Sequence, residues 1–172
     1  MKITFLGTSC MVPTKDRNHN GIFLDHLGEC ILVDCGEGIQ RQFKSIDLKP
    51  TKITKIFITH WHGDHVLGLP GLLQTLNKSN YDKKLEIYGP IGTKKSFDYM
   101  FKAFSFNLDF EYVIHDIEDT KIKLKEMIVI SKPLEHGLPC LGYSFVENDK
   151  RRIKPLEIKK LGIPEGPLLG EL

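Results

Sequence analysis

The sequence predicts a mixed α/β (α+β) fold, because short strand-like apolar runs predominate and helical segments lie between them. The runs at 21–25 and 30–34 are separated by a His-Leu-Gly turn, which predicts a hairpin. The other predicted strands are 1–7, 53–58 and 85–89, with further strands near 110–114, 121–131 and 141–147. The predicted helices are one or two turns at 39–46, then 66–77 and 93–106, the last with Phe97, Phe101 and Phe104 on one face.

The chain has the composition of a soluble globular domain, with 172 residues of which 41% are hydrophobic and 27% charged. Its 24 basic and 22 acidic side chains leave a net charge of +2, which predicts nucleic-acid binding only if the basic residues cluster. The four cysteines form no CxxC pair and are expected to be buried thiols in a reducing compartment. We find no signal peptide and no run of the roughly 20 apolar residues that a membrane span needs, so we expect the cytoplasm and no membrane partner.

The character of the sequence changes at Asn148, which divides it into a domain at 1–147 and a basic, Gly/Pro-rich segment at 148–172. This segment has no clear period and is predicted to be an extended arm or long loop outside the core. Its basic residues are Lys150, Arg151, Arg152, Lys154, Lys159 and Lys160. Such a cluster can bind phosphate groups without reading sequence, although charge alone favours a solvated tail.

The sequence Thr-His-Trp-His-Gly-Asp-His concentrates metal-binding side chains directly after a predicted buried strand. His60 and His62 project to the same side of an extended chain, because side chains alternate with a period of two. The next glycine permits a sharp turn, so that Asp64 and His65 begin the following helix and point at the same pocket. Imidazole and carboxylate groups suit zinc, and four of them in this order indicate a metal site rather than structural histidines.

Two metal ions are implied rather than one. His60 and His62 can share one ion, while Asp64 and His65 point to a second a few ångströms away, as in two-metal hydrolases. His136 ends an apolar strand and precedes a glycine, where a ligand can be presented. It is the expected third histidine of the first ion.

Together these segments resemble the ribonuclease Z family of the metallo-β-lactamase superfamily, along the whole chain. The HxHxDH sequence at 60–65 is typical of the superfamily, and the Gly-Leu-Pro-Gly-Leu that follows it is typical of ribonuclease Z. The other matching segments are FLGTS at 5–9, PTKDRN at 13–18, DCGEG at 34–38, YGP at 88–90, HGLPCLGY at 136–143 and LGIPEGPLL at 161–169. The resemblance implies an αββα sandwich in which two sheets pack face to face.

By this resemblance, a complete site holds two zinc ions per subunit. His60, His62 and His136 would bind the first ion, and Asp64 and His65 the second. Asp64 would also be the proton acceptor of catalysis. Zinc would lower the pKa of water and so supply a nucleophile at neutral pH.

Asp34 resembles the family's supporting aspartate, which would orient metal ligands through hydrogen bonds. The alternative is a turn residue at the end of a strand, and the residues alone leave both interpretations open.

The resemblance implies a zinc-dependent endoribonuclease that removes the 3′ trailer from transfer-RNA precursors. The products would be a transfer RNA with a 3′-hydroxyl and a trailer with a 5′-phosphate. The end of the chain resembles the arm with which the family clamps the elbow of transfer RNA, a recognition of shape. The residues of this arm expected to bind RNA are Lys159, Lys160, Gly162, Pro164, Gly166 and Pro167. A homodimer is expected, because in the family the arm of one subunit serves the active site of its partner.

The chain departs from the family by ending at the arm, which we expect to be incomplete, without the second half that supplies further ligands. The second zinc ion is therefore expected to bind weakly, and an apolar sheet face is expected to be bare and prone to association. The remaining histidines, His19, His26 and His115, are expected to be surface or loop residues. An expressed fragment, a split or frameshifted gene and a separately encoded C-terminal half are the open explanations.

Two other functions stay open. One is a different phosphodiesterase of the superfamily, such as a cyclic phosphodiesterase, against which the Gly/Pro-rich arm argues. The other is a non-catalytic fragment that binds transfer RNA and needs a separate C-terminal half for chemistry.

Overall fold

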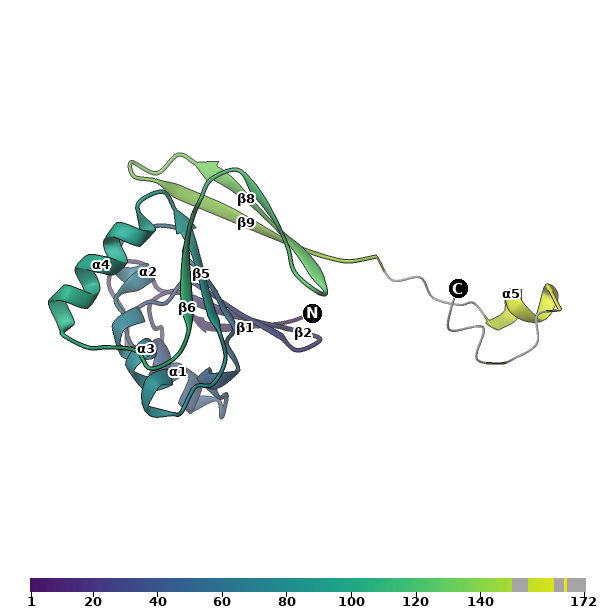
Figure 1. The fold of residues 1–172 in the computed structure, drawn as a ribbon, viewed down its shortest axis with the longest axis horizontal. Coiled ribbons are helices and arrows are strands. Elements are labelled where there is room, and N and C mark those ends of the chain that lie inside the picture. Colours follow the sequence, from purple (N-terminus) through teal and green to yellow (C-terminus); the bar gives the residue numbers. More distant parts are fainter. Residues whose placement is uncertain (150–154, 163–165, 167–172) are drawn as a thin grey trace.

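The chain folds into a layer of helices, a six-stranded sheet and a second, three-stranded sheet that faces the first (Figure 1). The computed structural model describes residues 1–149, 155–162 and 166. The helices lie on one side of the larger sheet, and β8 and β9 lie across its other side (Figure 1). The predicted mixed α/β class is therefore confirmed.

The larger sheet has the strand order β1-β2-β3-β4-β5-β6, antiparallel from β1 to β3 and parallel from β3 to β6. Its strands are β1 (Lys2–Gly7), β2 (Gly21–His26), β3 (Glu29–Val33), β4 (Lys55–Phe57), β5 (Leu85–Pro90) and β6 (Tyr112–Ile117). The predicted hairpin is confirmed, because β2 and β3 pair directly and are joined by Leu27 and Gly28, both with positive φ. The parallel strands direct their carboxyl ends to one edge of the sheet, where loops can carry a site.

The helices α1 (Ile39–Ser45), α2 (Gly63–Val66), α3 (Leu69–Lys78) and α4 (Thr93–Phe104), with a 3₁₀ turn at Pro50–Lys52, belong to the first layer. They bury an apolar core against the sheet, in which Phe43 and Phe97 are fully inaccessible. Phe101 packs at the edge of this core. Phe104 was predicted for the same face, but it lies in the last turn of α4 and is 55% exposed.

The second sheet consists of β7 (Thr120–Lys123), β8 (Met127–Leu134) and β9 (Cys140–Glu147), all antiparallel. The single strand predicted at 121–131 was wrong, because the chain turns back where the Leu124 amide donates to the Met127 carbonyl. A second apolar core fills the space between the two sheets. Phe57 lies in it, stacked on Tyr88 at 4.8 Å and edge-on to Tyr143 and Phe145 at 5.2 and 5.7 Å.

Part of the inner face of the larger sheet is exposed at β1. Ile3 and Phe5 pair with Leu24 and Ile22 of β2 and so lie on the face that carries the inter-sheet core. They are nevertheless 52% and 65% exposed. This agrees with the predicted apolar surface, and association of chains through it stays a prediction.

The segment after Asn148 is not extended throughout, which corrects the predicted arm or loop. A helix, α5, spans Pro155–Lys160, with Lys159 and Lys160 in its last turn. Gly162 follows with a φ of 66°. Gly166 is also described, whereas Pro164, Pro167 and the basic residues at 150–154 lie outside the described residues. None of the helices in the described part of the chain is long and apolar enough to cross a membrane.

Candidate metal centre

Four of the five predicted ligands lie just after the carboxyl end of β4, and the supporting Asp34 follows β3. The chain leaves β4 through Ile58 and Thr59, and His60, Trp61 and His62 form a short loop before α2 begins. The amide of Ile58 donates to the Tyr88 carbonyl of β5, which fixes the start of this loop on the sheet. The indole of Trp61 donates to the Thr93 hydroxyl at 2.9 Å and packs edge-on against Phe97, which fixes its outer side on α4.

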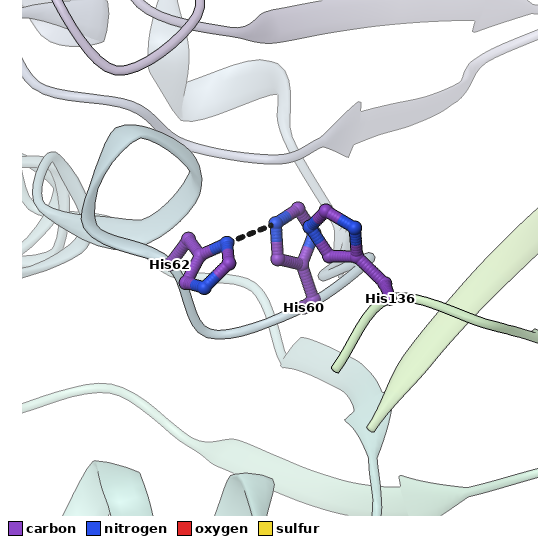
Figure 2. Close-up of side chains that lie close together, drawn as sticks. All are labelled: His60, His62 and His136. Carbon is purple, nitrogen blue, oxygen red and sulfur yellow. Dashed lines mark hydrogen bonds between the residues drawn. The ribbon is translucent and has the colours of Figure 1, made fainter. Parts of the chain in front are cut away.

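Three predicted histidines come together, as Figure 2 shows. One ring nitrogen from each of His60, His62 and His136 lies within 4.8 Å of the others. Nε2 of His60 is 3.1 Å from Nδ1 of His62, and the rings of His60 and His136 have centroids 4.5 Å apart. His60 is buried, whereas His136 is exposed. The group combines residues 76 positions apart in the chain, since His136 lies in the loop between β8 and β9 of the second sheet.

His136 reaches the cluster because the β8–β9 hairpin is held against the loop after β4. The Leu141 amide donates to the Thr59 carbonyl at 2.9 Å, and the Tyr143 hydroxyl donates to the Ile58 carbonyl at 2.8 Å. Gly137 turns the hairpin with a φ of 74°, a conformation that favours glycine. Inter-sheet packing thus decides where His136 lies.

Asp64 and His65 occupy the first turn of α2, as predicted, beside the three histidines. The ring centroids of His60 and His65 are 4.1 Å apart, and Nε2 of His65 is 3.5 Å from Oδ2 of Asp64. Asp64 is buried, and its Oδ2 accepts a hydrogen bond from the Met11 amide at 3.0 Å. Its Oδ1 is buried and has no hydrogen-bond partner among the described residues.

Asp34 contacts a histidine, as the orienting interpretation requires. It is fully buried, and its Oδ2 accepts hydrogen bonds from Nδ1 of His65 at 2.7 Å and from the side-chain Nδ2 of Asn20 at 2.9 Å. Its Oδ1 accepts from the Thr59 backbone amide at 2.8 Å. Asp34 does end a strand with a φ of 58°, which aspartate tolerates, so the turn interpretation describes its backbone but not its side chain.

Burial lowers the pKa of His60 to about 4, with a further contribution from neighbouring His65. The ring is therefore neutral at physiological pH, the form that binds metals. For His65, burial alone would lower the pKa, but the hydrogen bond to Asp34 and the charges of Asp34 and Asp64 together raise it. A metal ion at Nε2 of His65 would compete with the proton that this ring binds more readily.

Two glycines allow the loop after β3 to touch the metal motif. A Cβ on Gly36 would lie 2.4 Å from the Asp64 carbonyl oxygen, and a Cβ on Gly68 would lie 2.1 Å from the Gly36 carbonyl oxygen. The Cys35 amide donates to the His65 carbonyl at 2.7 Å across this contact. The DCGEG segment therefore holds α2 at the end of β3, which the sequence did not reveal.

These residues fit a divalent metal ion on two observations. Three imidazole groups converge on one point, and such donors suit zinc and related metals. The buried Asp64 Oδ1 has no partner in the described residues, and an ion would satisfy it. The predictions missed the supporting residues Met11, Asn20 and Tyr143, because contacts made by distant loops leave no local signal.

The remaining predicted positions lie outside this cluster. His26 was expected at the surface or in a loop, but it is a buried residue of β2, with Nδ1 3.5 Å from Oε1 of Glu147. His115 also lies in a strand, β6, stacked on Tyr88 at 4.5 Å. His19 is a loop residue, as expected, but it is buried. Neighbouring strands and loops cover His19 and His26, which the sequence pattern did not predict, whereas the His115 side chain is 36% exposed.

Comparison with known proteins connects this geometry to a family. Residues 1–122 match the family model described as Anti-Pycsar protein Apyc1. Curated relatives named Ribonuclease Z from Thermococcus gammatolerans, Methanocaldococcus jannaschii and Methanococcus maripaludis are 43%, 43% and 45% identical to the chain. These matches cover 100% of this chain but 55%, 56% and 57% of the relatives. The chain thus spans about half the length of the curated relatives it matches.

Solved structures agree with the fold. Human tRNase Z, short form, matches with a TM-score of 0.77 and 35% identity, over 86% of this chain and 65% of that chain. The metallo-β-lactamase fold protein YhfI from Bacillus subtilis matches with a TM-score of 0.69 at 16% identity, over 84% of this chain and 56% of that chain. The predicted fold class and the resemblance to ribonuclease Z are confirmed. The chain belongs to the family that the Apyc1 model describes, has the metallo-β-lactamase fold, and is similar over its whole length to ribonucleases Z.

Proposed function

We propose that the chain forms the metal-binding part of a zinc-dependent endoribonuclease that removes the 3′ trailer from transfer-RNA precursors. The reaction would leave a 3′-hydroxyl on the transfer RNA and a 5′-phosphate on the trailer. One observation carries the proposal: the convergent His60, His62 and His136 lie in a chain that is 43% identical over its full length to a ribonuclease Z. We assign the reaction to the cytoplasm as part of the same proposal.

In this proposal His60, His62 and His136 hold one zinc ion, and Asp64 and His65 contribute to a second. Bound zinc supplies Lewis-acid chemistry, which makes water a better nucleophile at neutral pH and neutralises charge on the phosphoryl oxygens. Because these residues make up only two ligands of the second ion, it binds more weakly than the first in this chain.

Asp64 is the proton acceptor in the proposed reaction. The Met11 amide holds one carboxylate oxygen at 3.0 Å, while the other has no hydrogen-bond partner among the described residues and can ligate a metal or take a proton. Burial limits the access of bulk water to this oxygen. Asp34 keeps the His65 ring in position through the 2.7 Å contact.

We assign RNA binding to the segment after Asn148. Lys159 and Lys160 in α5 would contact phosphates of the transfer-RNA elbow, together with Gly162, Pro164, Gly166 and Pro167. A homodimer would let the arm of one subunit serve the site of its partner. This assignment rests on the resemblance in sequence and on the basic charge.

The experiment that tests the function is cleavage of a transfer-RNA precursor with a 3′ trailer by the purified chain and added zinc, with both product ends mapped. The expected result is a single cut after the discriminator nucleotide, slowed by about 10²–10⁴-fold in Asp64→Ala because the proton acceptor is lost. Salt-dependent transfer-RNA binding without any cut, unchanged in Asp64→Ala, would instead indicate the non-catalytic fragment.

A second candidate is another phosphodiesterase of the same fold that acts on a small substrate. The match of residues 1–122 to the Apyc1 model favours it, because this match leaves out the arm. Cleavage of a small chromogenic phosphodiester without cleavage of the RNA precursor would support this candidate and contradict the first.

A further inference from the structure

Thr59 lies between the Asp34 carboxylate and the His60 ring. Its hydroxyl oxygen is 3.1 and 2.9 Å from Oδ1 and Oδ2 of Asp34. On the other side it is 2.9 Å from Nδ1 of His60. A single hydroxyl therefore connects a buried carboxylate to a candidate metal ligand.

The number of protons available fixes the direction of these hydrogen bonds. A carboxylate only accepts, and Asp34 already accepts from the Thr59 amide, the Asn20 side chain and the His65 ring. The Thr59 hydroxyl proton must point to Asp34, because otherwise lone pairs of two oxygens would face each other at 2.9 Å. The hydroxyl lone pairs then face His60.

The ring proton of His60 consequently sits on Nδ1 and is donated to the Thr59 hydroxyl. This leaves a bare lone pair on Nε2, the nitrogen that lies 3.1 Å from Nδ1 of His62 inside the histidine cluster. Asp34 acts on His65 in the same way but directly, since Nδ1 of His65 donates to it at 2.7 Å. The Nε2 atom of His65 is then bare on the side of Asp64.

We propose that Asp34 and Thr59 form one relay that fixes the tautomers of both His60 and His65. Asp34 acts on His65 by direct contact and on His60 through the Thr59 hydroxyl. Because the two histidines belong to different ions of the proposed pair, one buried carboxylate prepares a ligand for each ion. Thr59 is a positioning residue, since its hydroxyl contacts the histidine rings, at 2.9 Å from Nδ1 of His60 and more distantly at 3.4 Å from Nδ1 of His65.

The inference rests on the proposed metal site but not on the RNA substrate. Its failure is therefore distinguishable from failure of the proposed function: tautomers and metal affinity are measured without RNA, and cleavage is measured separately. Loss of cleavage with an intact relay would count against the function only.

The direct test is nitrogen NMR of the metal-free protein with ¹⁵N-labelled histidine. In the wild type, at a pH at which both rings are neutral, His60 and His65 are expected to carry the proton on Nδ1, with Nε2 unprotonated. Thr59→Val keeps the shape of the side chain but lacks the hydroxyl, so His60 should become a mixture of tautomers while His65 does not change. Thr59→Ser restores the hydroxyl and the wild-type spectrum. A wild-type His60 with its proton on Nε2 would overturn the relay without any variant.

Metal affinity is the second readout, measured by titration with cobalt. Loss of an outer hydrogen-bond partner typically weakens binding by about 10–100-fold, and we expect this for Thr59→Val but not for Thr59→Ser. Thr75→Val is the matched control, because it removes a half-buried hydroxyl that bonds Gln40 at 3.0 Å on the helix layer. Equal affinities for Thr59→Val and Thr75→Val would contradict the proposal.

A double-mutant cycle tests whether Asp34 and Thr59 act as one unit on His60. If they do, adding Thr59→Val to Asp34→Asn lowers the cobalt affinity by much less than Thr59→Val does alone. If the losses of cobalt affinity in the two single variants simply multiply in the double variant, Asp34 and Thr59 act independently, which refutes the relay.

Discussion

The candidate metal centre joins two regions that are built differently. The first is the motif region, made of Asp34, Thr59, His60, Asp64 and His65 around the ends of β3 and β4. Its side chains are mostly buried, and its ligands are fixed by hydrogen bonds to Asp34 and by the turn into α2. Most of these side chains are placed by one short stretch of sequence.

The second region is the β8–β9 hairpin, which contributes a single exposed histidine, His136. The hairpin contacts the motif region through the Leu141 amide, the Tyr143 hydroxyl and the aromatic packing on Phe57. The positions of His60 and His62 are therefore set locally, whereas that of His136 depends on how the sheets pack. A substitution that disrupts packing between the sheets should therefore weaken metal binding more than an equally destabilising substitution elsewhere.

The largest effect is expected for Phe57→Ala. Removal of a buried phenylalanine typically costs about 3–5 kcal/mol, and this one also separates the hairpin from the motif region. Phe43→Ala is the control, since Phe43 is equally buried but packs against Phe23 on the helix side. We expect similar losses in denaturant unfolding but weaker metal binding only for Phe57→Ala, at conditions where both proteins are folded. Equal metal affinities would mean that inter-sheet packing does not place His136.

His136→Ala tests whether metal affinity can be lost without a loss of folding stability. Metal affinity should fall by more than about 100-fold, since a direct ligand contributes more than the outer partners whose loss costs about 10–100-fold. The free energy of unfolding of the metal-free protein should change by less than about 0.5 kcal/mol, because the side chain is exposed. His60→Ala should reduce both quantities. His115→Ala, a histidine outside the cluster, should leave the affinity unchanged in the same cobalt titration.

The pH dependence of stability should report on the motif region. The folded pKa of His60, about 4, is below its ordinary value of 6.5, so between these values the unfolded chain binds the additional proton. Unfolding free energy is then expected to fall by about 1–2 kcal/mol between pH 7 and 5 through His60 alone.

His65 contributes with the opposite sign, because its pKa is raised: its stabilisation is present at low pH and is lost as pH rises. His65→Gln should therefore steepen the loss of stability toward pH 5, and His60→Gln should flatten it. Denaturant unfolding of the metal-free proteins across this range measures both. Identical slopes in the two variants would contradict the assignment of these shifts.

The smallest effect is expected for Tyr143→Phe, which removes one hydrogen bond between the regions. It should cost about 0.5–1.5 kcal/mol, and the matched Tyr81→Phe should cost the same, because Tyr81 donates to the Ile53 carbonyl on the helix side. Only Tyr143→Phe should weaken metal binding, by a few-fold. Cobalt titration of both variants checks this, and an equal loss in Tyr81→Phe would assign the effect to general destabilisation.

The two regions also differed in how well the sequence predicted them. The ligands of the motif region follow from residue spacing alone, since His60, His62, Asp64 and His65 lie within six positions between a strand and a helix. The contact of Asp34 with His65 was one of two open interpretations. The partners of these residues, Met11 and Asn20, were not predicted, because a backbone amide and a loop amide carry no distinctive pattern.

The wrong predictions of secondary structure and burial lie where tertiary contacts override the local sequence pattern. The stretch at 121–131 alternates like one strand, yet the turn before Met127 divides it so that both halves can pair in one sheet. Phe104 has helical spacing, but α4 ends there and leaves it without a core to cover it. The six-residue helix α5 was also missed, because the segment after Asn148 is rich in Gly and Pro and has no clear helical period.

The amino-acid sequence was enough to predict most of the strands and helices, the family that the chain resembles, and the candidate metal ligands presented by one loop. These follow from spacing and residue type, which act over a few positions. Tertiary structure alone brings His136 to His60 and His62, and places Asp34 against both His65 and the Thr59 hydroxyl. Both outcomes depend on the packing of two sheets and on buried hydrogen bonds between distant segments, and no local pattern contains that information.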